Sequence, residues 1–223
     1  MTTVGVIVFP GTNCELDAVS AVQTAGGSAE LIWHGEKDLG DVDAVVVPGG
    51  FAHGDYLRSG AIARFSPIMD SVARFAADGG PVLGICNGFQ VLAEAGLVPG
   101  ALQKNAGLKF MCQPVKLRVE STSNVVGAQY ELGQELMIPI NHFEGNYTVG
   151  PETLRELVDN DQVFLRYVEN PNGSVSSIAG VSNRAGNVVG LMPHPERASN
   201  ALLGSADGLP MFASLLVSSL VAS

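Results

Sequence analysis

The sequence places one cysteine where an apolar strand would turn directly into a helix. Cys86 stands in Gly-Ile-Cys-Asn-Gly (residues 84–88), after the apolar run Val82–Ile85 and before a helical pattern over Asn87–Ala95. A nucleophile on such a turn is lifted clear of the backbone, and the flanking glycines remove side chains that would clash. The start of a helix also favours the thiolate and offers N–H groups to a developing oxyanion. The alternative is a structural cysteine in a tight turn, but the strand–turn–helix context favours a nucleophile.

A thiol nucleophile needs a base, and the base needs a group that orients it. His194 follows the apolar run Val188–Met192 in Met-Pro-His-Pro-Glu, where two prolines hold it extended. Residues two apart in an extended chain point to the same side, so Glu196 can reach one ring nitrogen while the other faces Cys86. The alternative is a loop histidine beside an exposed glutamate.

Two further segments are expected near this cysteine. Pro48-Gly49-Gly50 follows another apolar run, so the N–H groups of Gly50 and Asn87 are predicted to form an oxyanion hole; the alternative is an ordinary glycine-rich turn. The segment Asn141–Gly145 also follows a strand, which makes His142 a candidate for lining the cleft.

The remaining histidines and cysteines are predicted to have no chemical role. His34 and His53 are expected to be surface or structural residues. Cys14 and Cys112 are expected to be inert, small residues of the core.

The pattern of elements predicts an α/β protein with a doubly wound, mostly parallel sheet and the active site at its carboxyl edge. Continuous apolar runs are typical of strands buried on both faces, and helical patterns alternate with them. In the middle of the chain Phe110–Glu120 and Glu135–Ile140 alternate apolar and polar residues, which predicts a small antiparallel annex. No repeat or linker interrupts residues 1–223, so one domain is expected. The other predicted strands are Val4–Phe9, Ala29–Trp33, Val42–Val47, Val163–Val168 and Ser177–Ser182. Three more helices are predicted: one over Pro151–Asp159, one that starts at Ser66-Pro67, and one whose buried stripe is Leu16, Val19, Val22 and Ala25.

Composition excludes several functional classes. The net charge of −10 argues against a nucleic-acid binder and against an anionic membrane surface as a target. Three sparse cysteines indicate neither a disulfide framework nor a zinc site. Neither a phosphate-binding loop nor a dinucleotide fingerprint occurs, so no cofactor or metal is expected in this chain. The sequence shows no pattern of a signal peptide or a membrane span, and we expect a cytoplasmic protein.

Taken together, these segments resemble the class I (triad) glutamine amidotransferases, whose fold is flavodoxin-like. Three stretches narrow the resemblance to the glutaminase subunits of phosphoribosylformylglycinamidine synthase, and it runs essentially from end to end. They are Phe9-Pro10-Gly11-Thr12-Asn13-Cys14, the segment 54–64 (Gly-Asp-Tyr-Leu-Arg-Ser-Gly-Ala-Ile-Ala-Arg) and the segment 203–209 (Leu-Gly-Ser-Ala-Asp-Gly-Leu). One departure is Phe143, which stands where the family pattern has glycine.

The resemblance implies a glutaminase in purine biosynthesis. Cys86 would attack the side-chain amide of L-glutamine, His194 would transfer protons and Glu196 would orient it. Gln90 would help to seat the substrate. The ammonia would pass to a large ATP-dependent synthetase, which carries the ATP and Mg and makes formylglycinamidine ribonucleotide, and a small third subunit would bridge the two.

Two other functions remain open on the sequence. One is another hydrolase on the same fold, such as a cysteine peptidase or a deglycase-like stress protein. The other is a non-catalytic regulatory or assembly subunit. The position of Glu196 and the segment 54–64 argue against the first, and the complete Cys86, His194 and Glu196 set argues against the second.

Overall fold

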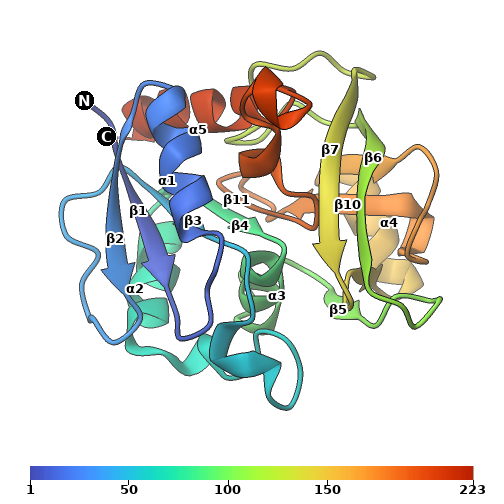
Figure 1. The fold of residues 1–223 in the computed structure, drawn as a ribbon, viewed down its shortest axis with the longest axis horizontal. Coiled ribbons are helices and arrows are strands. Elements are labelled where there is room, and N and C mark those ends of the chain that lie inside the picture. Colours follow the sequence, from blue (N-terminus) through green and yellow to red (C-terminus); the bar gives the residue numbers. More distant parts are fainter. Residues whose placement is uncertain (223) are drawn as a thin grey trace.

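A mixed sheet of nine strands forms the centre of the molecule (Figure 1). The computed structural model describes residues 1–222, with side chains up to Ser218. The strand order is β2-β1-β3-β4-β11-β10-β9-β6-β7, and β5 and β8 form a separate small sheet. The strands are β1 (Thr3–Val8), β2 (Ser28–Trp33), β3 (Ala44–Val47), β4 (Val82–Ile85), β5 (Ala101–Gln103), β6 (Met111–Val119), β7 (Glu135–His142), β8 (Asn146–Thr148), β9 (Val163–Tyr167), β10 (Ile178–Ser182) and β11 (Val188–Leu191).

The first five strands of this order pair in parallel and form the doubly wound half that the sequence predicts. From β1 the chain goes to its neighbour β2 at the edge of the sheet. It then returns to β3 on the other side of β1 and goes on to β4, the next strand away from β2. Right-handed crossovers therefore place helices α1 (Glu15–Thr24) and α2 (Pro67–Ala77) on opposite faces of the sheet. The reversal lies between β1 and β3, and open parallel sheets form ligand sites at such a point.

The other four strands extend the sheet in antiparallel fashion. The predicted alternation is present in β6, where Val115 and Leu117 are buried and Lys116 is exposed. The predicted strands 110–120 and 135–140 therefore exist, but they belong to the central sheet because β6 also pairs with β9. The separate antiparallel sheet is built from β5 and β8 instead.

The helices follow the predicted segments, with one correction. Helix α1 buries Ala18, Ala21 and Val22, whereas Leu16 is 64% exposed. Positions three and four apart share a helix face, so the small alanines and Val22 form the contact, and Leu16 lies outside it. The other elements are α3 (Asn87–Glu94), α4 (Pro151–Asp159), α5 (Leu209–Ala222) and the short 3₁₀ segments η1 (Ala52–Asp55), η2 (Ala63–Phe65), η3 (Val175–Ser177), η4 (Pro195–Ala198) and η5 (Ala201–Leu203). Within residues 1–222, no helix combines the length and the apolar character needed to cross a membrane.

Helix α3 packs close to strands β3 and β11, because the contacts contain glycines, one in the helix and one in β11. A Cβ on Gly88 would collide with the carbonyl oxygen of Val47 at the end of β3. A Cβ on Gly190 in β11 would collide with the ring of Phe89, which is fully buried. The glycines thus set the position of the helix that starts directly after Cys86.

We predict that Gly190→Ala destabilises the fold. The added methyl group meets the buried Phe89 ring in a packed core, where overpacking costs about 1–3 kcal/mol. Gly107→Ala is the matched control, since nothing lies within 4 Å of its added Cβ. We expect the control to stay within about 0.5 kcal/mol of the parent protein in urea unfolding. Equal stabilities of the two variants would contradict the close packing of α3 on β11.

Candidate active site

Three strand ends bring the predicted catalytic segments together. Strand β4 pairs in parallel with β3 on one side and with β11 on the other, with Leu191 opposite Ile85. The next N–H along the chain, that of Cys86, donates to the carbonyl of Leu191 at 2.8 Å. Parallel strands deliver their carboxyl ends to one edge, so the residues after β3, β4 and β11 meet there.

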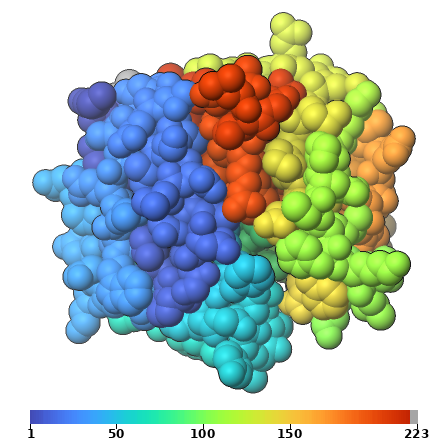
Figure 2. Space-filling view, viewed as in Figure 1, coloured from blue at the N-terminus to red at the C-terminus, as the bar shows by residue number. Residues whose placement is uncertain are grey.

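A cavity of about 260 Å³ opens beside Cys86. Its walls come from the segment after β3, from the elbow and helix α3, and from the segment at the end of β7. In Figure 2 the cyan, orange-red and yellow-green parts of the surface meet around a recess on this face. The lining residues are Gly50, Phe51, Asp55, Ser59, Cys86, Gln90, Phe110, Asn141, His142, Phe143 and Glu144.

Cys86 occupies the sharp turn that the sequence predicts. Its φ of 49° and ψ of −105° lie outside the regions that side-chain-bearing residues normally adopt. Such strain persists only where the surroundings impose it, here a buried strand before the residue and helix α3 after it. The thiol is 5% exposed and donates to the backbone carbonyl of Asn141 at 3.6 Å.

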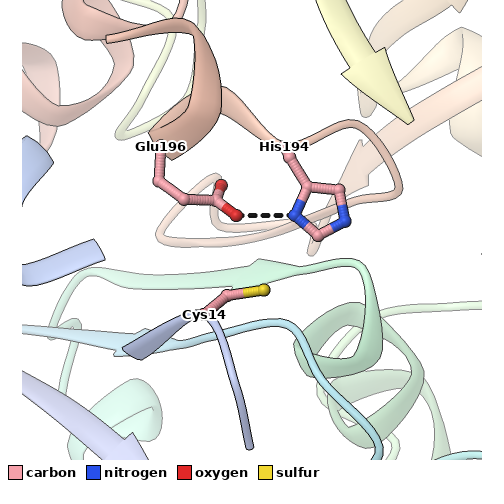
Figure 3. A group of neighbouring side chains, drawn as sticks. All are labelled: Cys14, His194 and Glu196. Atoms are coloured by element: carbon pink, nitrogen blue, oxygen red, sulfur yellow. Dashed lines mark hydrogen bonds and ion pairs between the residues drawn. The ribbon is translucent and has the colours of Figure 1, made fainter. Parts of the chain in front are cut away.

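His194 and Glu196 form a buried pair at the start of η4. The Nδ1 atom of His194 lies 2.6 Å from Oε1 of Glu196, as drawn in Figure 3. The backbone N–H of His194 donates to the carbonyl of Pro139 at 2.8 Å, which fixes the segment against β7. Neither His194 Nε2 nor Glu196 Oε2 has a hydrogen-bond partner among the described residues. Nε2 is therefore free to exchange a proton.

The pair favours a protonated imidazole. Burial opposes the charged form of His194, but the Glu196 carboxylate and the neighbouring Cys86 outweigh it and raise the pKa of His194 well above its usual range. The charge of Cys86 contributes to raising this pKa, so the sulfur lies near the imidazole. An imidazolium beside a thiolate is the state that a cysteine nucleophile requires.

Cys14 lies beside this pair, which the sequence did not predict. It is buried, as expected of a core residue, but it approaches His194 and Glu196 from the residue directly before helix α1 (Figure 3). Its sulfur accepts a hydrogen bond from Nη2 of Arg197 at 3.2 Å. The only available signal was its place as the last residue of the motif 9–14, in the segment between a strand and a helix.

Cys14, His194 and Glu196 also offer ligand atoms within 4.8 Å of one another, the spacing of a metal site. The guanidinium of Arg197 already supplies positive charge at the sulfur, and Nδ1 is engaged by the carboxylate. These contacts disfavour a metal ion, and the absence of a metal stays a prediction.

The predicted oxyanion-hole residues are Gly50, which lines the same cavity as Cys86, and Asn87, which follows Cys86 in the chain. Gly50 lines the cavity and has a φ of 148°, and a Cβ there would come within 2.8 Å of the backbone of Thr12. Asn87 opens helix α3. Its side chain has a further structural role, because Oδ1 accepts from the N–H of Ala52 at 2.9 Å.

The predicted substrate residues Gln90 and His142 both line the cavity. Oε1 of Gln90 accepts from Asn87 Nδ2 at 2.8 Å, and its Nε2 donates to the carbonyl of Glu144 at 2.5 Å. Nδ1 of His142 lies 3.0 Å from Oδ1 of Asn105. Burial, aided by the charge of His194, lowers the pKa of His142 to about 4, so this imidazole is neutral.

Other residues of the wall were missed by the sequence reasoning. Asp55 and Ser59 lie in the segment 54–64, which was singled out without a role for either residue. Phe143, which the sequence singled out as the departure from the family pattern, also lines the cavity, and Lys104 Nζ lies 5.9 Å from the centre of its ring.

His34, His53 and Cys112 lie outside the cavity lining. His34 Nδ1 and His53 Nε2 contact Ser66 Oγ at 3.1 and 3.4 Å, which is a structural role. The prediction that Cys112 is a core residue is wrong, because its side chain is exposed. In β6 the buried positions are Val115, Leu117 and Val119, so an even-numbered residue faces the other side.

Comparison with known proteins agrees with this geometry. The profile of the CobB/CobQ-like glutamine amidotransferase domain matches residues 1–207. The chain is 58% identical to the phosphoribosylformylglycinamidine synthase subunit PurQ of Lacticaseibacillus casei, over 95% of this chain and 93% of that protein. It is 55% identical to PurQ of Rubrobacter xylanophilus, over 96% of this chain and 97% of that protein. The chain belongs to the PurQ family of glutamine amidotransferases.

A solved structure supports the same assignment. A chain of PurLQS from Thermotoga maritima superimposes with a TM-score of 0.90 at 41% identity, covering 97% of this chain and 98% of that one. The expected fold and the expected resemblance to this synthase subunit are thus confirmed. The alternative of another hydrolase on the same fold, such as a cysteine peptidase or a deglycase-like stress protein, finds no support among these PurQ relatives.

We predict a stability loss at acid pH that is specific to His142. The folded protein keeps this imidazole neutral down to pH 4, whereas the unfolded chain takes up a proton below about 6.5, so stability falls as the pH drops through this window. The contribution is about 1.5 kcal/mol between pH 6.5 and pH 5. His142→Asn keeps an N–H donor for Asn105 and cannot titrate. The free energy of unfolding, measured in urea at pH 6.5 and pH 5, should change less with pH in the variant than in the parent protein. An equal change in both proteins would refute the prediction.

Proposed function

We propose that the chain hydrolyses L-glutamine through a thioester on Cys86. The observation that carries this proposal is the buried His194–Glu196 pair, held at 2.6 Å beside a cysteine on a strained turn that opens into a cavity. Membership of a glutamine amidotransferase family supports glutamine as the source of the amide.

The chemistry follows from the positions of the atoms. The Cys86 thiolate attacks the amide carbon of glutamine, and the N–H groups of Gly50 and Asn87 stabilise the oxyanion. The imidazolium of His194 gives its proton to the departing nitrogen, which leaves as ammonia, and a glutamyl thioester remains. Neutral His194 then takes a proton from water, whose oxygen attacks the thioester. Glutamate is released and the thiolate returns, and Glu196 stabilises His194 whenever the ring is protonated.

The ammonia is then used by a partner. We infer that this chain, like its PurQ relatives, is a subunit of phosphoribosylformylglycinamidine synthase and assembles with a large synthetase subunit and a small bridging subunit. ATP and Mg act on the large subunit, and formylglycinamidine ribonucleotide is its product in purine biosynthesis. A cytoplasmic location follows from this role.

We predict that Cys86→Ala abolishes glutamate release from glutamine while the protein stays folded. The cysteine side chain is the electron source for the first bond, so no thioester forms without it. Cys112→Ala is the control, because this exposed cysteine lies outside the cavity lining. Glutamate release should be measured with the synthetase and bridging subunits present.

Labelling separates catalysis from a purely structural subunit. A glutamine-analogue alkylator should modify Cys86 stoichiometrically in the parent protein and in Cys112→Ala. Retained glutaminase activity in Cys86→Ala would exclude the proposed nucleophile. An unlabelled Cys86 would instead favour the non-catalytic assembly role.

We predict that Glu196→Gln slows glutamine hydrolysis by roughly 100-fold or more, because an amide cannot stabilise the imidazolium. The limb of the pH–rate profile that reports His194 should also move to lower pH, since Glu196 is the largest influence raising that pKa. Glu152→Gln, an exposed change at the start of α4, is the control. An unchanged rate and profile would show that Glu196 does not act on His194.

A further inference from the structure

Two carboxylates face the cavity that contains the nucleophile. Asp55 comes from η1 after β3, and Glu144 comes from the segment that follows β7. Among the described residues that line this cavity, none is lysine or arginine. The proposed chemistry at Cys86 uses neither carboxylate.

The protein compensates these carboxylates incompletely. Oδ1 of Asp55 accepts from Asn87 Nδ2 at 3.1 Å, and Oε2 of Glu144 accepts from Ser59 Oγ at 3.0 Å. The Ser59 hydroxyl also acts on Asp55, but it carries one proton and cannot donate to both. Burial raises the pKa of Asp55, the Ser59 contact lowers it, and the charge of Glu144 raises it again. The two groups therefore repel each other in a partly buried place.

A third acceptor lies in the same wall. Oδ1 of Asn105 accepts the proton on Nδ1 of His142, so the neutral ring carries a lone pair on Nε2. This atom is buried and has no partner among the described residues. Two carboxylates and a neutral imidazole thus line a space whose wall has no lysine or arginine, and such a space suits a ligand that brings positive charge and N–H donors.

We propose that Asp55 and Glu144 bind the α-ammonium group of the substrate amino acid. The inference rests on the proposed glutaminase function and adds the determinant by which the cavity distinguishes an α-amino acid amide from a simple carboxamide. The side-chain amide of glutamine lies at Cys86, and its ammonium group at the other end of the molecule neutralises the carboxylate pair. Binding there also sets the distance from the ammonium site to the sulfur, so that an amide carbon two methylenes beyond the α-carbon reaches it.

The competing explanation is a purely structural one. Asp55 and Glu144 also connect the segment 51–59 to helix α3 and to the end of β7, through Asn87 and Ser59. Loss of either carboxylate would then impair every substrate equally. Ammonium recognition predicts instead that the loss depends on whether the substrate has an amino group.

The test compares two substrates in the complete complex with the synthetase and bridging subunits. One is L-glutamine, and the other is glutaramic acid (4-carbamoylbutanoic acid), which is identical except that it lacks the amino group. For the parent chain we expect kcat/KM for ammonia release to be roughly 10- to 100-fold higher with glutamine, the worth of a charge-assisted contact. In Asp55→Asn and in Glu144→Gln, the ratio of the two kcat/KM values should fall to within about threefold of unity. The fall should come from a lower kcat/KM for glutamine, with little change for glutaramic acid.

Glu94→Gln is the matched control. Glu94 holds Arg58 of the same segment at 2.5 Å but lies outside the cavity lining, so its loss should leave the substrate ratio unchanged. Equal losses on both substrates in Asp55→Asn and Glu144→Gln, or a parent chain without preference for glutamine, would overturn the inference while leaving the glutaminase intact. A parent complex that releases no ammonia from glutamine would instead refute the proposed function itself.

Discussion

The parallel pairing of β4 between β3 and β11 is the constraint on which the site depends. It delivers the turn at Cys86, the Gly49-Gly50 segment and the His194 segment to one edge of the sheet. Glycines then allow helix α3 to approach both neighbours, since a side chain at Gly88 or Gly190 would push the helix away. The strained backbone of Cys86 is held between these two fixed elements, and the sulfur position follows from the packing of the core.

One amide side chain links the walls of the cavity. Asn87 accepts from the N–H of Ala52 and donates to Asp55 and Gln90, and Gln90 donates onward to the carbonyl of Glu144. The residue after the nucleophile is therefore connected to both segments that face it. A displacement of either segment breaks buried hydrogen bonds, which costs more than their net contribution when formed. The binding wall and the nucleophile thus keep a common geometry.

Unpartnered buried atoms are concentrated around this geometry. His194 Nε2, Glu196 Oε2 and His142 Nε2 have no protein partner among the described residues, although buried polar atoms in native proteins are usually paired. The low dielectric of the site strengthens the attraction between Glu196 and protonated His194 and also makes unpaired groups costly.

The sequence by itself determined the strands, the turn at Cys86 and the extended His194–Glu196 segment, because each depends on neighbours a few residues away. Apolar runs, prolines and glycines are local signals, and the parallel half of the sheet follows from their alternation. The sequence did not place Cys14 beside His194, did not show Cys112 exposed, and gave Asp55 and Glu144 no role. Those outcomes depend on which strands become neighbours and which face each residue takes, so only the tertiary structure decided them.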